Sequence, residues 1–168
     1  MSTELINKAL AVAASQVGVT EKPLNSNRGP QVDLYLQSVG IYGPASWCAA
    51  FVHWCFLQAA KELGIDNPLV KTGGCWDHWR KCESKGAKRY TAAQVAKNPK
   101  LLKPGLLFVM DFGKGAGHTG FVLAIDGKRI VTIEGNTNTD GSRNGIGVFK
   151  RSRSIASINL GFIDYSGD

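Results

Sequence analysis

The spacing of the apolar residues changes once along the chain, at Lys103-Pro104-Gly105. Before this point the apolar residues follow helical spacing. After it they form short runs of branched and aromatic side chains separated by Gly and Asp-Gly. Helices followed by antiparallel strands are typical of an α+β fold, in which N-terminal helices pack on one face of a C-terminal antiparallel β-meander. The sequence contains no linker or repeat, so we expect residues 1–168 to form a single domain.

Turn-forming residues divide the chain into its expected elements. The predicted helices cover residues 3–16, 32–38, 47–63 and 75–83. A capping box at Thr91-Ala92-Ala93-Gln94 predicts a further short turn that ends before Pro99. The predicted strands cover residues 106–112, 119–125, 130–134, 145–150 and 160–163.

The predicted helix 47–63 carries a cysteine in its first turn. Ser46 is its expected N-cap, and Cys48 follows two residues later. The unpaired amides and the dipole of a helix N-terminus can lower a thiol pKa from ~8.5 to about 3.5–7.5. Cys48 is therefore a candidate nucleophile. A lone buried cysteine is more often a small core residue, so the choice depends on the partners of the thiol.

A thiol nucleophile needs a base, and the chain has three histidines. His53 lies five residues beyond Cys48, about 140° around the helix axis, and is expected to face elsewhere. His78 lies within the predicted helix 75–83 and is interpreted as structural or substrate-facing. His118 begins a predicted strand, where a side chain can be presented at the edge of a sheet. His118 is therefore the preferred base.

Glu134 and Asn136 end the next predicted strand and could orient the base. If a three-residue loop, 126–128, joins the two strands, His118 lies opposite Asn136 and Glu134 lies on the diagonal of the same face. A two-residue turn at 126–127 would turn both side chains away from His118. The residues alone leave this choice open.

Four motifs occur in order: Trp47-Cys48-Ala49-Ala50-Phe51-Val52, Lys103-Pro104-Gly105, Gly117-His118-Thr119-Gly120-Phe121-Val122 and Glu134-Gly135-Asn136. This set resembles the CHAP family of cysteine amidohydrolases and peptidases, which are relatives of the NlpC/P60 enzymes within the papain-like fold. The resemblance covers about residues 21–165. It implies a peptidoglycan hydrolase, either an endopeptidase or an N-acetylmuramoyl-L-alanine amidase. Cys48 would be the nucleophile, His118 the base, and Glu134 or Asn136 the third member.

Four aromatic residues are candidates for substrate binding. The Cys48 amide and one further donor are expected to hold the oxyanion, and Tyr42 is considered for that second donor. Trp47, Trp76 and Trp79 are considered as lining of the cleft, although buried aromatic residues more often belong to the core.

No metal or cofactor is expected. Asn25, Asn27 and Asp33 are a poor version of the acidic calcium loop that some phage relatives carry. Cys75, His78 and Cys82, in the spacing Cys75-x-x-His78-x-x-x-Cys82, are potential zinc ligands. Two turns of the predicted helix separate the two cysteines, however, which disfavours a compact zinc site.

The chain carries 20 basic and 13 acidic residues, a net charge of +7, which favours an anionic partner. The basic residues crowd the middle and the end of the chain: Arg80, Lys81, Lys85, Lys88, Arg89, Lys97, Lys100, Lys103, Lys150, Arg151 and Arg153. A nucleic-acid-binding module or a non-catalytic wall binder with an inert cysteine are the alternatives. The sequence contains no recognised nucleic-acid-binding motif, so we expect a peptidoglycan peptide as partner, and no nucleic acid.

Residues 8–14 are too short and too weakly apolar for a signal peptide, and no stretch is long enough to span a membrane. We therefore expect synthesis in the bacterial cytoplasm and action at the cell wall or periplasm after delivery. The route could be a secretion apparatus, such as a type VI system, with an immunity protein as a further partner. The alternative is that the chain is a phage endolysin, which reaches the wall through a lesion in the membrane.

Overall fold

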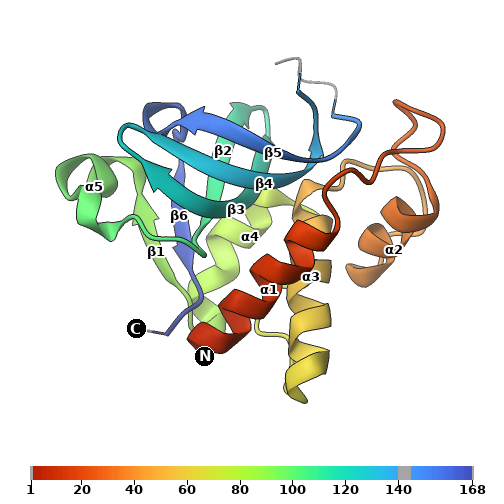
Figure 1. Cartoon of the computed structure of the whole chain (residues 1–168), viewed down its shortest axis with the longest axis horizontal. Coiled ribbons are helices and arrows are strands. Elements are labelled where there is room, and N and C mark those ends of the chain that lie inside the picture. The colour runs from red at the N-terminus through yellow and green to blue at the C-terminus, as the bar shows by residue number, and fades with distance from the viewer. Residues whose placement is uncertain (1, 140–144, 168) are drawn as a thin grey trace.

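The computed structural model describes residues 2–139 and 145–167, and it places a layer of helices against a six-stranded sheet (Figure 1). The helices are α1 (Thr3–Ser15), α2 (Pro30–Ser38), α3 (Cys48–Leu63), α4 (Cys75–Lys81) and α5 (Ala92–Lys97). Short 3-10 helices cover Cys82–Lys85, Pro99–Leu101 and Ile155–Ser157. The strands are β1 (Lys88–Thr91), β2 (Leu107–Gly113), β3 (Ala116–Asp126), β4 (Arg129–Thr137), β5 (Gly147–Ser154) and β6 (Gly161–Asp164).

The sheet has the order β1-β6-β2-β3-β4-β5, and every neighbouring pair is antiparallel. Strands β2 to β5 form the expected meander, whereas β6 returns to lie between β1 and β2. Strand β1 was not expected, because its sequence Lys-Arg-Tyr-Thr lacks a buried alternation and only pairing with β6 makes it a strand. The predicted α+β fold is confirmed.

Local signals place the helix boundaries. Helix α2 starts two residues before its expected start because Pro30 occupies the first turn, where its missing N–H costs nothing. Helix α5 carries the predicted capping box, in which Thr91 and Gln94 satisfy each other's backbone amides. Helix α4 stops at Lys81 and continues as a 3-10 turn. Among the described residues, no helix has the length and apolar character needed to cross a membrane.

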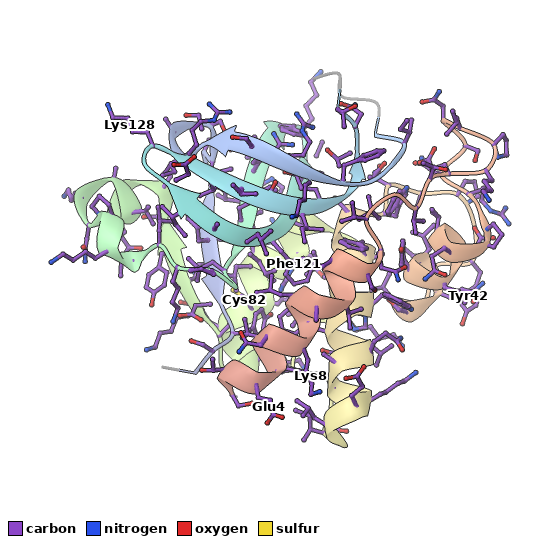
Figure 2. The ribbon with its side chains drawn as sticks, viewed as in Figure 1. Glu4, Lys8, Tyr42, Cys82, Phe121 and Lys128 are labelled. Atoms are coloured by element: carbon purple, nitrogen blue, oxygen red, sulfur yellow. The ribbon has the colours of Figure 1, made fainter. Side chains whose placement is uncertain are left out.

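Alternate residues of the same strands build two hydrophobic clusters. Phe121 of β3 (Figure 2) belongs to the cluster beneath α1 and α3. Its ring contacts those of Phe51 and Phe56. Val122 belongs to the cluster on the other face of the sheet, together with Val95 of α5. The sequence predicted that the helices all pack on one face of the sheet. This prediction is wrong for α5, which covers the second face.

Candidate active site

Helix α3 begins at Cys48, with Trp47 rather than the expected Ser46 at the cap position. The Trp47 side chain does not cap the helix. It is fully buried at 0% exposure, and its indole N–H donates to Glu21 Oε1 at 2.9 Å. The expectation that Trp47 lines a cleft is therefore wrong, because the core requires this side chain. The first-turn amides beside Cys48 have no acceptors within the helix and are not capped by the Trp47 side chain.

The Cys48 thiol is 4% exposed and has polar neighbours from two other elements. Its sulfur lies 3.5 Å from the Cys75 sulfur, at the start of α4. A hydrogen bond from Cys75 lowers the pKa of the Cys48 thiol well below its usual value. Burial opposes this shift, and His118 and the backbone amide of Thr119 lower the pKa further. The arrangement therefore stabilises a thiolate at the helix N-terminus.

The hairpin between β3 and β4 uses neither of the two expected turns. Asp126 pairs with Arg129, so the loop consists of Gly127 and Lys128. This loop lies one residue beyond the expected two-residue turn. Taken alone, its register would not place His118 opposite Asn136.

A bulge in β3 then corrects the register. Beyond the bulge Val122 pairs with Thr132, and the ladder ends one pair later. Continued along the strands, this register sets His118 opposite Asn136 and Glu134 opposite Gly120. The expected diagonal neighbourhood of His118 and Glu134 is thus present, but a bulge produces it rather than a three-residue loop.

Gly120 leaves the space that Glu134 occupies. A Cβ at position 120 would lie 2.9 Å from the Glu134 Cγ and 3.0 Å from the Ile133 carbonyl oxygen. Across this space His118 Nε2 bonds to Glu134 Oε1 at 2.8 Å. The other ring nitrogen of His118, Nδ1, is then the one available to the thiol.

Glu134 is completely buried and accepts hydrogen bonds from three side chains besides His118. Arg153 of β5 donates to it from Nε at 2.6 Å and from Nη2 at 2.7 Å, and the hydroxyls of Thr132 and Thr137 donate at 2.6 Å and 3.1 Å. Burial raises the pKa of Glu134, but Arg153 and His118 outweigh it and lower the pKa well below its usual range. The site therefore holds a permanent carboxylate beside the imidazole.

The charge on Glu134 also affects His118. Burial disfavours the imidazolium, but hydrogen bonds to Cys48 and Glu134 outweigh burial and raise the pKa of His118 to about 9. The imidazole also packs against the rings of Phe108 and Phe112. A thiolate and an imidazolium are therefore the stable pair at neutral pH.

Asn136 does not take the same position as Glu134. Its backbone adopts a left-handed conformation, with φ of 54°, and its side chain is partly exposed. Within residues 2–139 and 145–167, no hydrogen bond joins Asn136 to His118. Of the two expected third members, the structure brings Glu134 to the ring and not Asn136.

The other two histidines lie outside the site. His53 is buried between Ser38 and Asn67, at 3.1 Å and 3.2 Å from its ring nitrogens, and burial lowers its pKa to about 4. His78 bonds to the Tyr165 hydroxyl at 2.8 Å, and burial lowers its pKa to about 4 as well. Both histidines are neutral core residues.

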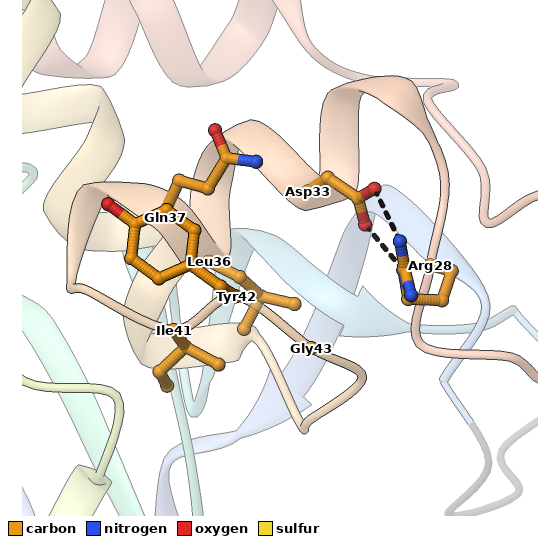
Figure 3. A pocket seen from close by; sticks show the side chains of 7 residues that line it. All are labelled: Arg28, Asp33, Leu36, Gln37, Ile41, Tyr42 and Gly43. Carbon is orange, nitrogen blue, oxygen red and sulfur yellow. Dashed lines mark hydrogen bonds and ion pairs between the residues drawn. The ribbon is translucent and has the colours of Figure 1, made fainter.

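Tyr42 projects from the outer edge of the molecule and is 82% exposed (Figure 2). It lines a small pocket of about 60 Å³ beside the ion pair of Arg28 and Asp33 (Figure 3). In the described part of the chain, no hydrogen bond connects Tyr42 with Cys48. Its expected role as an oxyanion donor has no supporting contact.

The same view shows that Asp33 is engaged by a cation of the chain itself. Arg28 donates to both of its carboxylate oxygens, at 3.0 Å and 3.2 Å. Asp33 is the one carboxylate of the weak calcium-loop pattern, so a calcium ion would have to displace a guanidinium.

The two tryptophans of α4 differ. Trp79 is 6% exposed and packs in the core beneath Arg89, so it does not line a cleft. Trp76 is partly exposed and lines an open pocket of about 310 Å³. The other residues of that pocket are Arg80, Asp111, Gly113, Lys114 and Gly115. Neither Cys48 nor Cys75 is among the residues that line this pocket.

Cys75, His78 and Cys82 do not converge on a common point. Cys75 faces Cys48, His78 bonds to Tyr165, and Cys82 donates to the Trp79 carbonyl at 3.3 Å. Across residues 2–139 and 145–167, no three potential metal-ligating side chains form a group.

Sequence reasoning missed two residues that contact the site. Arg153 was grouped with the basic end of the chain. However, Arg151 and Arg153 flank Ser152 on a strand, and such alternation signals that both point to one face. Cys75 was considered only as a metal ligand, and no local signal connects it with Cys48, 27 residues away.

Comparisons with known proteins find a matching family and a similar solved fold. The sequence model of the CHAP domain matches residues 40–136, which is more than half of the chain. The crystal structure of Ly7917 has a similar fold, with a TM-score of 0.53 and 18% identity over 95% of this chain. A second structure, of Ly7917 "with the hydrolyzing product of MDP", gives a TM-score of 0.52 at 18% identity over 95% of this chain. The chain spans 62% of the length of each of those chains.

A search of curated proteins finds no relative of the chain. The similarity to Ly7917, at 18% identity, shows a common fold. The family match runs from the turn before α3 to Asn136, and it includes Cys48, His118 and Glu134. The chain therefore belongs to the CHAP domain family.

Proposed function

We propose that this chain is a peptidoglycan hydrolase that cleaves an amide bond of the wall peptide by thiol chemistry. One observation carries the proposal: a thiol at a helix N-terminus adjoins an imidazole whose other nitrogen bonds to a buried carboxylate. Membership of the CHAP family supports the class of reaction. The similarity of fold to a structure described with "the hydrolyzing product of MDP" supports the substrate class.

In the proposed mechanism the Cys48 thiolate attacks the carbonyl carbon of the scissile amide. The His118 imidazolium gives its proton to the leaving amine, and the neutral imidazole then activates the water that hydrolyses the thioester. Glu134 does not touch the substrate. Its bond to Nε2 fixes the ring so that Nδ1 faces the thiol, and its charge stabilises the imidazolium.

The oxyanion would be held at the first turn of α3. The backbone amide of Cys48 lies at the positive end of the helix dipole, and its direction is fixed by the helix. A preorganised amide donor stabilises the tetrahedral intermediate more than the ground-state carbonyl, which lowers the barrier.

We propose the pocket lined by Trp76 as a place where the wall peptide lies. Trp76 provides an aromatic wall, and the Arg80 guanidinium stands over its ring at 5.6 Å. Arg80 and Lys114 give this pocket two cations against the single carboxylate of Asp111, which the Trp76 indole N–H engages at 3.2 Å. A peptide that carries carboxylate groups suits such a surface.

The alternative of a nucleic-acid-binding module has less support. Several of the basic side chains that suggested it are paired with carboxylates: Lys81 with Asp77, Arg89 with Glu83, Lys103 with Asp164 and Arg153 with Glu134. These cations are less available to phosphates than the net charge suggests.

For the biological setting we propose a delivered antibacterial effector or a phage lysin that acts from the inner side of the wall. The test is expression in a Gram-negative host, with and without an added export signal. Lysis that requires both export and Cys48 supports a periplasmic target. Equal toxicity without export would contradict it. Suppression of lysis by a co-expressed neighbouring gene product would favour an effector with an immunity partner over a lysin.

The activity itself is tested with purified protein and peptidoglycan sacculi. We expect the wild type to release muropeptides whose new termini, read by mass spectrometry, identify the bond as an amidase or endopeptidase target. The Cys48→Ala variant should release none. Equal release by both proteins would rule out Cys48 as the nucleophile, and release by neither would point to a binding role.

A further inference from the structure

The site contains a second thiol that the proposed mechanism does not use. Cys75 is the first residue of α4, is 7% exposed, and lies with its sulfur 3.5 Å from that of Cys48. Both cysteines are free thiols. The two sulfurs are therefore in contact at the reactive centre.

The packing around Cys75 directs it toward Cys48. Gly117 of β3 lies against it, and a Cβ at position 117 would come within 3.1 Å of the Cys75 Cβ. On the other side, Gly73 and Gly74 precede Cys75 and form the turn into α4. A disulfide requires the sulfurs to approach to ~2.05 Å, a movement of about 1.5 Å that side-chain rotation and a small shift at this turn can supply.

We propose that Cys48 and Cys75 form a reversible disulfide on exposure to hydroperoxides, and that this bond switches the hydrolase off. The switch rests on the proposed function, since it blocks the proposed nucleophile. The disulfide itself depends only on the two thiols.

Hydrogen peroxide, the simplest hydroperoxide, supplies the two-electron oxidation. The Cys48 thiolate attacks the peroxide, an S–O bond forms, the O–O bond breaks, and the departing hydroxide takes the proton of the His118 imidazolium to give water. The Cys75 thiol then attacks the resulting sulfenic acid. An S–S bond forms, the S–O bond breaks, and the Cys75 proton leaves with the hydroxide as a second water.

The other two cysteines cannot replace Cys75. Cys55 lies two turns along α3, about 10 Å from Cys48 along the helix axis, and is fully buried. Cys82 is fully buried and donates to the Trp79 carbonyl. Cys82 is therefore a suitable control site, since a serine there keeps the donor.

The physical consequence is a hydrolase whose activity follows the redox state of its surroundings. In a reducing cytosol thiol exchange would keep the pair reduced, whereas the bacterial cell envelope is kept oxidising. A chain that reaches the wall would then have a limited active period, set by the rate of Cys48 oxidation.

The test treats the full chain with hydrogen peroxide, blocks free thiols with iodoacetamide, and maps the peptides by mass spectrometry without reduction. Wild type, Cys75→Ser and Cys82→Ser are compared. Hydrolysis of sacculi is measured for each protein before oxidation, after oxidation and after dithiothreitol, relative to its own starting activity.

We expect a peptide that links Cys48 to Cys75 in the wild type and in Cys82→Ser, with loss of hydrolysis that dithiothreitol restores. Cys75→Ser should form no linked peptide, and its Cys48 should proceed to sulfinic acid, so its loss should resist dithiothreitol. Sulfinic acid at Cys48 with a free Cys75 in the wild type would overturn the proposal. A linked protein that still hydrolyses sacculi would overturn the switch. If the reduced wild type does not cut sacculi, the proposed function fails, while the peptide map still decides whether the disulfide forms.

Discussion

Cys48 and Cys55 lie on the same helix, seven residues apart, and both are buried. Yet the pKa values of their thiols are shifted in opposite directions from that of an ordinary cysteine. Burial raises the pKa of Cys55 well above its usual value. At Cys48 the same burial is outweighed by a hydrogen bond from Cys75 and by the His118 side chain, so its pKa is lowered. Burial alone therefore makes a thiol inert, and converging partners make it a nucleophile.

The difference arises from position along α3. Cys55 packs within the hydrophobic cluster beneath the helices, where burial raises the pKa of its thiol. Cys48 lies at the end of α3, where α4 supplies Cys75 and β3 supplies His118 and the Thr119 amide. A helix N-terminus placed against a strand is thus the element that turns a core residue into a reactive one.

The largest expected effect separates these two cysteines by activity. Cys48→Ala should lower hydrolysis of sacculi by ~10⁵-fold, because it removes the nucleophile, and should leave the fold intact. Cys55→Ala should leave the specific activity unchanged and cost about 1 kcal/mol of unfolding free energy, since it deletes only buried volume. Activity assays and urea unfolding measure both variants. Loss of activity in Cys55→Ala without unfolding would contradict the assignment of Cys55 as an inert core residue.

The second expected effect concerns the group that orients His118. Glu134→Gln should lower activity by about 10³-fold, because the imidazole loses its charged partner. Since Glu134 helps to raise the pKa of His118 to about 9, the alkaline limb of the pH profile should move to lower pH in this variant.

Asn136→Gly is the matched control for that variant, because glycine tolerates the positive φ of 54° at this position. It should retain most of the activity and the wild-type alkaline limb. A profile that shifts in Asn136→Gly and not in Glu134→Gln would assign the orienting role to Asn136.

The third expected effect concerns the guanidinium that keeps Glu134 charged. Arg153→Met should cost about 3 kcal/mol of unfolding free energy near neutral pH, because the buried Glu134 carboxylate loses the guanidinium that donates two hydrogen bonds to it and keeps only the His118, Thr132 and Thr137 donors described above. The folded-state pKa of Glu134 lies well below the ~4.3 of an ordinary glutamate, so this pairing stabilises the fold above that pH, and its contribution is lost as the pH falls through the lowered pKa. The difference from wild type should therefore shrink in acid, as urea unfolding at several pH values will show.

Arg151→Met is the control on the same strand. Arg151 donates to the Thr137 hydroxyl at 2.9 Å and does not pair with Glu134, so its loss should cost about 1 kcal/mol. Equal costs for both arginine variants would contradict a special role for Arg153.

The smallest expected effect concerns the thiol donor. Cys75→Ala should raise the pKa of Cys48, because it removes the hydrogen bond that lowers that pKa most. Cys75→Ser keeps a donor and should shift the pKa less. The pH dependence of alkylation, followed residue by residue, measures this shift. An unchanged Cys48 pKa in Cys75→Ala would show that the Cys75 hydrogen bond does not lower it.

Local signals were sufficient for much of this account. The apolar stretch of residues 47–63 predicted a helix with Cys48 in its first turn, and the change of periodicity at residues 103–105 predicted a helical and then a stranded part. His118 could be singled out because it begins the predicted strand, although β3 itself starts two residues earlier, at Ala116. Each of these features depends on neighbours within a few residues.

The features that the sequence did not reveal depend on distant contacts. The bulge that aligns Glu134 with His118 lies inside a regular apolar run, and nothing in that run marks it. Trp47 was expected to line the cleft because it is an aromatic residue next to Cys48. Its indole instead bonds to Glu21, which lies 26 residues earlier. Arg153 and Cys75 reach the site only through pairing of β5 and packing of α4.

The most direct measurement of the central claim is the rate of iodoacetamide alkylation of Cys48 and Cys55 in the native chain from acidic to alkaline pH, resolved by mass spectrometry. We expect Cys48 to react with a midpoint well below the ~8.5 of an ordinary thiol, while Cys55 stays unmodified in the folded protein. A Cys48 midpoint at or above ~8.5, or equal labelling of both residues, would contradict this expectation.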